Sequence, residues 1–229
     1  MTRPRQQELP FRIHGGKRRG AGRKRLHELG RVAHHIRPEH KKAHPVHVTL
    51  RARSKLPSLR TQVVFQTIRR ALGRTARSWF RVVHFSVQTN HIHLLIEAND
   101  KLSLARGLGG AAIRLARAIN RAAKRKGGVW EDRYHSRPLR TPREVRNGLV
   151  YVLMNWKKHT PGAKGFDPCS SASSFEGWIV PPAAGPPSDD SIATPVTWLL
   201  RIGWKRHGLV ALSERPRLVD RSPLPLLVE

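Results

Sequence analysis

Four stretches of the chain show the two-residue alternation or the β-branched and aromatic enrichment that is typical of strands. A turn signal at Thr89-Asn90 separates the second stretch from the third, so these two are expected to form a hairpin. Pro138 places the last stretch at a sheet edge or at a strand end. The expected strands cover residues 45–53, 79–88, 91–97 and 129–140.

Helical periodicity fills the segments between these stretches. The expected helices cover residues 57–72, 103–126 and 142–159, with a further short one at 195–206. The helix at 142–159 has the clearest start, because Thr141 can cap it, Pro142 suits its first position and Glu144 completes a capping box. The order β-α-β-β-α-β-α predicts an α+β fold: a ferredoxin-like core, which is also the plan of RNA-recognition motifs, followed by an added helix.

Composition divides the chain into three parts. Residues 1–44 are basic and rich in Gly and His, so we expect a flexible N-terminal extension. Residues 45–160 contain the expected strands and the three long helices, and are predicted to form the folded domain. Residues 161–229 begin with a Pro-, Ser-, Gly- and Ala-rich stretch that is typical of a linker, so we expect an irregular tail with one short helix.

The chain carries a strong excess of positive charge, with 44 Lys and Arg against 15 Asp and Glu and a formal net charge of +29. The excess is N-terminal, since residues 1–60 contain 17 basic and 3 acidic side chains whereas residues 160–229 contain 7 of each. Such an excess indicates a polyanionic partner, and nucleic acid is the leading candidate. The candidate DNA-binding residues are Lys17, Arg18, Arg19, Arg23 and Lys24 in the extension, and Arg114, Arg117 and Arg121 along the helix at 103–126. A solvated basic surface is the alternative for both groups.

A single cysteine, Cys169, excludes an internal disulfide framework and a multi-cysteine zinc site. The N-terminus has no apolar segment of secretory type, and no stretch approaches the roughly 18 apolar residues of a membrane helix. We therefore expect a cytoplasmic protein without a membrane partner.

Two histidines flank one apolar residue in the run His91-Ile92-His93. Side chains alternate between the two faces of a strand, so His91 and His93 share one face while Ile92 enters a core on the other. Two neighbouring imidazoles can ligate a divalent metal. The alternative is a pair of partly buried histidines whose nitrogens are satisfied by hydrogen bonds.

A polar stripe runs along the expected helix at 142–159. Its members recur every four residues and are Asn147, Tyr151, Asn155 and His159. Tyr151 offers a phenolic nucleophile, and the amide oxygen of Asn155 one turn later could ligate the same metal as the histidines. The alternative is an amphipathic tyrosine at the core edge, and Tyr134 is the competing nucleophile. Further side chains that could assist the metal are Glu97, Glu131 and Asp132.

Together these residues suggest a phosphoryl-transfer site. A metal on His91, His93 and Asn155 would polarise a scissile phosphate, and Tyr151 would attack phosphorus. The product would be a phosphotyrosine with a free hydroxyl on the leaving strand. The covalent link would keep the strand end activated for rejoining.

The run Asn90-His91-Ile92-His93-Leu94-Leu95 resembles the histidine–hydrophobe–histidine strand of the HUH endonucleases, and in particular that of single-tyrosine insertion-sequence transposases. It is most similar to the REP-associated tyrosine transposases, a resemblance that the run from Val129 to Ser136 and the helix around Tyr151 support. The resemblance covers about residues 45–160.

This resemblance implies a metal-dependent endonuclease and strand transferase that acts on single-stranded DNA near hairpins, with Mg²⁺ or Mn²⁺ as cofactor. By position, it implies that His91 and His93 are metal ligands, that Tyr151 forms a 5′-phosphotyrosine, and that Asn155 stands where relatives carry Gln or Asn. It also implies a bacterial, nucleoid-associated protein that acts as a monomer or a homodimer. The alternative is a non-catalytic, domesticated DNA- or RNA-binding protein that retains the fold.

Overall fold

The computed structural model describes residues 39–158, 160, 162–180 and 189–216. The strands are β1 (Val46–Arg51), β2 (Phe80–Val87), β3 (His91–Ala98) and β4 (His135–Pro138). The helices are α1 (Gln62–Gly73), α2 (Lys101–Ala122), α3 (Pro142–Met154) and the short α4 (Trp198–Arg201). Short 3-10 helices cover Asn155–Lys158, Ala172–Ser174 and Gly203–His207. None of the described helices has both the length and the apolar content needed to span a bilayer.

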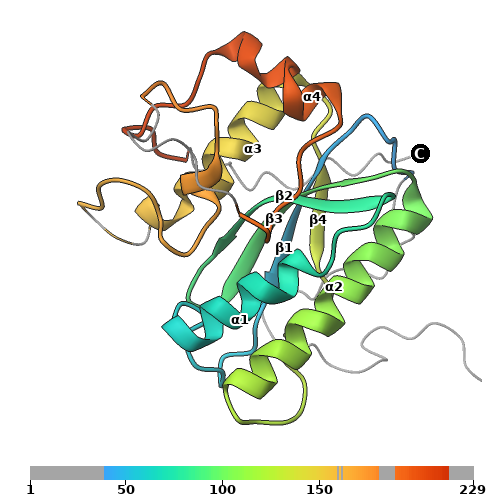
Figure 1. Cartoon of the computed structure of the whole chain (residues 1–229), viewed down its shortest axis with the longest axis vertical. Helices are drawn as coiled ribbons and strands as arrows, with labels where there is room; N and C mark the ends of the chain where they lie inside the picture. The colour runs from blue at the N-terminus through green and yellow to red at the C-terminus, as the bar shows by residue number, and fades with distance from the viewer. Residues whose placement is uncertain (1–38, 159, 161, 181–188, 217–229) are drawn as a thin grey trace, which may run out of the picture. The chain divides into compact units, whose positions relative to one another are not determined.

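The four strands form one antiparallel sheet in the order β2-β3-β1-β4. Helices α1 and α2 lie side by side on one face of this sheet, and α3 packs on the other face against β2 and β3 (Figure 1). The α+β class and the four-stranded sheet are therefore confirmed. The chain order and the spatial order of the strands are those of the predicted split βαβ plan.

The first hydrophobic core lies between the sheet and the helices α1 and α2. On β3, the side chains of Ile92, Leu94 and Ile96 point into this core and are fully buried. On β1, Val48 and Leu50 do the same. This alternation leaves the intervening residues of both strands for the opposite face, where α3 lies.

The second hydrophobic core lies between that opposite face and α3. Leu95 of β3 joins it, and the C-terminal part of the chain supplies the buried aromatic rings of Phe175, Trp178 and Trp204. The prediction of a linker followed by an irregular tail did not include this packing. The residues form no long helix or strand, yet they contribute to a core that covers α3.

Buried polar contacts fix this C-terminal segment to the sheet. Asp167 is fully buried and receives two hydrogen bonds from the Arg60 guanidinium, with N–O distances of 2.7 and 3.0 Å. Residues 169–171 then run beside β2, because the Val87 amide donates to the Cys169 carbonyl. Further along, the carboxylate of Glu97 accepts the backbone N–H groups that precede α4.

A second set of contacts ties the end of the described chain to α3. The Arg146 side chain donates to the carbonyl oxygens of Gly208 and Leu209 at 2.8 and 2.9 Å. It also forms a bidentate pair with Glu214. Lys157, just after α3, donates to the Leu212 carbonyl. We refer to Arg146, Lys157 and residues 208–214 as the C-terminal clamp.

Several helix boundaries differ from the expected ones by a few residues, and the boundaries of α1 and α3 do so for local reasons. Helix α1 begins at Gln62 and not near Pro57, because the Leu59 amide donates to the Thr89 carbonyl and the Leu59 side chain is fully buried. At the other end of the domain, the α-helix α3 ends at Met154 and continues as a 3-10 turn. Its predicted start is confirmed, since both hydrogen bonds of the capping box at Thr141 are present.

Candidate active site

The alternation of β3 places His91 and His93 on the sheet face that α3 covers. Their ring centroids are 4.6 Å apart, and His93 is 3% exposed. The His91 Nδ1 donates to the Asn90 side-chain oxygen at 2.8 Å, which leaves His91 Nε2 as the nitrogen with a lone pair. The predicted juxtaposition of the two imidazoles is therefore present in the fold.

Helix α3 brings Tyr151 to the same place within a single chain. The Tyr151 ring meets the His93 ring edge to face, with centroids 5.1 Å apart. Lys158 lies above the tyrosine ring, its Nζ 4.3 Å from the centroid, and burial lowers the pKa of this lysine. Tyr134 instead packs against the first core, on the far side of the sheet. The geometry therefore separates the two tyrosines, and only Tyr151 lies beside the histidine pair.

Asn155 is the remaining ligand that the sequence predicts. It is 1% exposed, and neither its amide oxygen nor its amide nitrogen has a hydrogen-bond partner among the described residues. Burying an amide without partners costs roughly 1–3 kcal/mol. A divalent cation would bind such an unpartnered amide oxygen, and Asn155 lies one turn after Tyr151.

The acidic candidates have other partners. Glu97 binds the backbone before α4, and Glu131 forms an exposed ion pair with Arg51 at 2.7 Å. Across the described ranges, no group of three or more His, Cys, Asp and Glu side chains is arranged to hold a metal ion. Among the described residues, His91, His93 and Asn155 are the predicted ligands that remain as candidates for a metal.

Two side chains of β1 belong to this site but were not among the predicted residues. His47 Nε2 lies 3.2 Å from His93 Nδ1, and Thr49 Oγ1 lies 3.1 Å from the same nitrogen. The His47 ring also contacts the Tyr151 ring, at a centroid distance of 5.3 Å. Burial lowers the pKa of His47 to about 4, with a smaller effect of Arg137. The alternation at 45–53 places His47 and Thr49 on one face, but only the pairing of β1 with β3 places them against His93.

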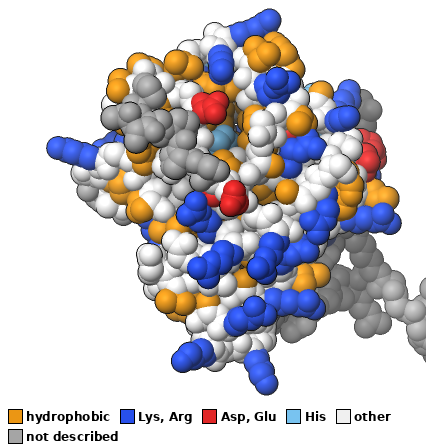
Figure 2. Space-filling view, viewed as in Figure 1, with side chains coloured by type: hydrophobic (Ala, Val, Ile, Leu, Met, Phe, Trp, Pro, Cys, Tyr) orange, Lys and Arg blue, Asp and Glu red, His pale blue; other side chains and the backbone are white. Residues whose placement is uncertain are grey.

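The predicted DNA-binding residues lie away from this site or outside the described residues. Arg114, Arg117 and Arg121 are on α2, on the sheet face opposite to Tyr151. Lys and Arg side chains gather over α1 and α2 in the view of Figure 2. The other candidates, Lys17, Arg18, Arg19, Arg23 and Lys24, are outside the described residues, as is His159 of the polar stripe.

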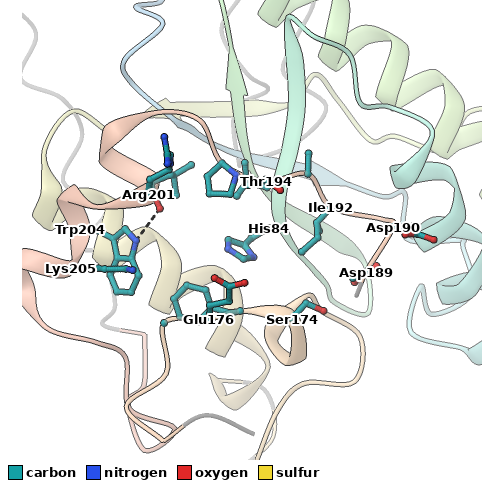
Figure 3. A pocket seen from close by; sticks show the side chains of 16 residues that line it. His84, Ser174, Glu176, Asp189, Asp190, Ile192, Thr194, Arg201, Trp204 and Lys205 are labelled. Carbon is teal, nitrogen blue, oxygen red and sulfur yellow. Dashed lines mark hydrogen bonds between the residues drawn. The ribbon is translucent and has the colours of Figure 1, made fainter. Parts of the chain in front are cut away.

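A separate cavity of about 520 Å³ lies around His84. In Figure 3 its labelled residues come from β2 and from three C-terminal segments, 174–177, 189–195 and 200–205. His84 Nδ1 bonds the Ser171 hydroxyl at 3.1 Å, and burial lowers the pKa of His84 to about 4. None of the predicted catalytic or metal-ligating residues lines this cavity, so it is distinct from the candidate active site.

Comparison with known proteins finds one family model that matches part of the chain. Residues 40–147 match the model described as IS200-like transposase. The matched segment contains the four strands, α1, α2 and the histidine pair, and it ends inside α3, before Tyr151.

Among the solved structures that are similar is a REP-associated tyrosine transposase bound to a REP hairpin. It is 18% identical, the TM-score is 0.46, and the match covers 56% of this chain and 74% of that one. No curated protein matches the chain.

Proposed function

We propose that this chain cleaves and rejoins single-stranded DNA, with Tyr151 as the nucleophile and the histidine pair as part of a divalent-metal site. The observation that carries the proposal is the edge-to-face contact between Tyr151 and His93 in one chain, 5.1 Å between centroids. The match of residues 40–147 to the IS200-like transposase model supports the same reaction class.

His91, His93 and Asn155 would hold the cation, Mg²⁺ or Mn²⁺. When bound, it would polarise a non-bridging phosphate oxygen and offset the negative charge that develops at phosphorus. The unpartnered amide oxygen of Asn155 suits such an ion, because carbonyl oxygens are ligands that Mg²⁺ and Mn²⁺ prefer, and the two imidazole nitrogens would complete the protein ligands. This ligand set is open, so it leaves room for the phosphate itself.

In the proposed reaction the Tyr151 oxygen forms a bond to phosphorus and the bond from phosphorus to the 3′ oxygen breaks. The phenolic proton leaves the tyrosine, and the departing 3′ oxygen takes up a proton from solvent. The products are a 5′-phosphotyrosine and a free 3′-OH, with one phosphoester exchanged for another. A second 3′-OH can reverse the step and rejoin the strand.

The first experiment is a search for a covalent protein–DNA adduct. The purified chain is incubated with single-stranded hairpin DNA and Mn²⁺, denatured, and analysed for a species of increased mass. We expect an adduct with the wild type and with Tyr134→Phe, and none with Tyr151→Phe. Absence of an adduct with the wild type across several hairpins would favour the non-catalytic DNA- or RNA-binding alternative. An adduct that survives Tyr151→Phe would move the nucleophile elsewhere.

A mixing experiment tests whether one chain contains the whole site. Tyr151→Phe lacks the nucleophile and His93→Ala lacks a ligand, so neither variant should form an adduct alone. Because Tyr151 and His93 of the same chain are in contact, we expect the mixture to be inactive as well. Adduct formation in the mixture would show that two chains share their sites.

For DNA binding we propose Arg114, Arg117 and Arg121 together with the five basic residues at positions 17–24. Neither α1 nor α2 contains an acidic residue, so no carboxylate within these helices offsets their charge. The slope of log affinity against log salt concentration for single-strand binding should become less steep by roughly 2 when the three arginines are changed to Gln, because each lost phosphate contact removes about 0.7 from the slope. The matched control replaces three cations of the C-terminal segment: Arg201, Lys205 and Arg206. An equal effect of both sets would argue against a specific role of α2.

A further inference from the structure

The chemistry proposed above assigns no role to two side chains of the site, His47 and Thr49. Resting on the proposed function, we propose that His47 and Thr49 are positioning residues that engage Nδ1 of His93 and so make Nε2 its metal-ligating nitrogen. They do not touch the reacting atoms. Both act through His93, by fixing its ring orientation and its tautomer, and His47 also contacts the ring of Tyr151.

Strand pairing places these residues where the role requires them. Thr49 stands directly across from His93 in the β1–β3 register, and His47 is two residues earlier on the same face. Between and beyond them, Val46, Val48 and Leu50 are 0–2% exposed in the first core. The core therefore fixes β1 in register, and β1 in turn fixes the two polar side chains against His93.

The contacts around Nδ1 restrict where its proton can be. The threonine hydroxyl is 3.1 Å from His93 Nδ1 and can accept a hydrogen bond from an N–H there, and His47 Nε2 is 3.2 Å away. Two facing imidazole nitrogens share one proton between them when both rings are neutral. If that proton is on His93 Nδ1, then His93 Nε2 has a lone pair and can bind a cation. A metal-binding histidine commonly donates its other N–H in this way.

The neighbouring histidine supports this assignment through an independent contact. His91 Nδ1 lies 2.8 Å from the Asn90 side-chain oxygen, which accepts and does not donate. His91 is therefore protonated at Nδ1, and its ligating nitrogen is Nε2. With His93 in the same tautomer, both rings present the same atom. Two Nε2 lone pairs on adjacent rings could then bind one cation.

His47 has a second contact that Thr49 lacks. Its ring meets the Tyr151 ring at 63°, with centroids 5.3 Å apart. It thus contacts the rings of both His93 and Tyr151, and so lies between β3 and α3. Loss of the hydroxyl of Thr49 should affect the metal alone, whereas loss of His47 should also affect the placement of the tyrosine.

The variants separate these roles from simple packing. Thr49→Val removes the hydroxyl and keeps the shape, and Thr49→Ser restores it. His47→Phe keeps a ring against Tyr151 but removes the nitrogen. Thr67→Val is the matched control, because Thr67 is on α1 and its hydroxyl bonds only the Val63 carbonyl. Urea unfolding of each variant shows whether the fold is intact.

Three measurements then test the proposal. In the metal-free protein, ¹⁵N side-chain NMR should show His93 as the Nδ1–H tautomer in the wild type and in Thr67→Val, with Nε2–H appearing in Thr49→Val and His47→Phe. The affinity for Mn²⁺, measured by electron paramagnetic resonance, should fall about 10- to 100-fold in these two variants and recover in Thr49→Ser. Adduct formation should fall with it.

The outcomes distinguish the positioning role of His47 and Thr49 from the proposed function. A wild-type His93 in the Nε2–H form, or an Mn²⁺ affinity that Thr49→Val leaves unchanged, would overturn the positioning role. A wild type with the Nδ1–H tautomer that binds no Mn²⁺ and forms no adduct would leave the hydrogen-bonded arrangement supported and would overturn the proposed function.

Discussion

The Arg60–Asp167 pair offers a quantitative test of how firmly the C-terminal segment is attached to the domain. Asp167 is fully buried, Arg60 is 24% exposed, and the pair is bidentate at 2.7 and 3.0 Å. The Asp167 carboxylate also accepts the Cys169 N–H at 2.9 Å. The hydrogen bonds to Asp167 raise the pKa of Arg60, so the guanidinium stays charged. The perturbation is Asp167→Ala, which leaves this charge partly buried without its partner.

The expected cost follows from this burial. Removing one partner of a buried ion pair costs about 3–5 kcal/mol. Arg60 is partly solvated and keeps its bond to the Val87 carbonyl at 2.8 Å, so we expect the lower end, about 3 kcal/mol. The control is Glu131→Ala. It breaks a pair of the same 2.7 Å length whose side chains are 59% and 46% exposed, and such pairs are worth about 0–1 kcal/mol.

Urea denaturation followed by tryptophan fluorescence measures both free energies of unfolding. Because Trp178 and Trp204 are buried in the second core, the signal also reports separate release of the C-terminal segment, as an early transition. The double variant Arg60→Leu/Asp167→Ala should recover part of the loss, since it removes the unpaired charge. A loss below about 1 kcal/mol for Asp167→Ala, equal to the control, would refute the view that this segment is an integral layer of the domain.

Two further predictions concern stability. Gly107→Ala should destabilise the protein by about 1–3 kcal/mol, because a Cβ there would lie 2.1 Å from the Phe80 ring. Gly110→Ala should stabilise α2 by about 1 kcal/mol, because a Cβ there would have nothing within 4 Å. The midpoints of urea unfolding measure both effects, and equal shifts for the two variants would contradict the packing argument. Burial lowers the pKa of His84 from 6.5 to about 4, against the opposing effect of Asp189, so its contribution to stability is complete above pH 6.5 and is lost as the pH falls towards 4. His84→Gln should therefore weaken the dependence of the urea midpoint on pH within this window and leave it unchanged above, and an unaltered dependence would show that other groups cause it.

The parts of the fold with strong local patterns could be predicted from the sequence. The β-branched run at 79–88 and the run from His91 alternate or are continuously apolar, and the Thr141 capping box marks the start of α3. These signals depend on neighbours a few residues apart, so a single sequence contains them. The order of these elements was enough to predict the class of fold and the sheet.

The C-terminal part was harder to predict because its signals are sparse. Phe166, Phe175 and Trp178 are separated by Gly, Pro and Ser, and the composition is that of a linker. The buried rings form a core through contacts with α3 and with one another, as in the 5.2 Å contact between Phe175 and Trp178. No periodicity shows such contacts, because the residues belong to no regular helix or strand.

Within the candidate site, the sequence indicated the residues with distinctive chemistry but not those that surround them. His91, His93, Tyr151 and Asn155 stand out by type and spacing. His47 was missed because its contact with His93 depends on the register of β1 against β3, which spans 46 residues of chain. The roles of all these residues remain predictions that the adduct and metal-binding measurements test.

The C-terminal clamp attaches the loop at 208–214 to α3, the helix that contains Tyr151. Because Arg146 bonds the loop at three residues and Lys157 at a fourth, a displacement of α3 must either carry this loop along or break these bonds together. Movement of Tyr151 by itself would therefore be costly. In the proposed reaction, the exchange of strand ends would then depend on movement of the DNA or on joint movement of α3 and this loop.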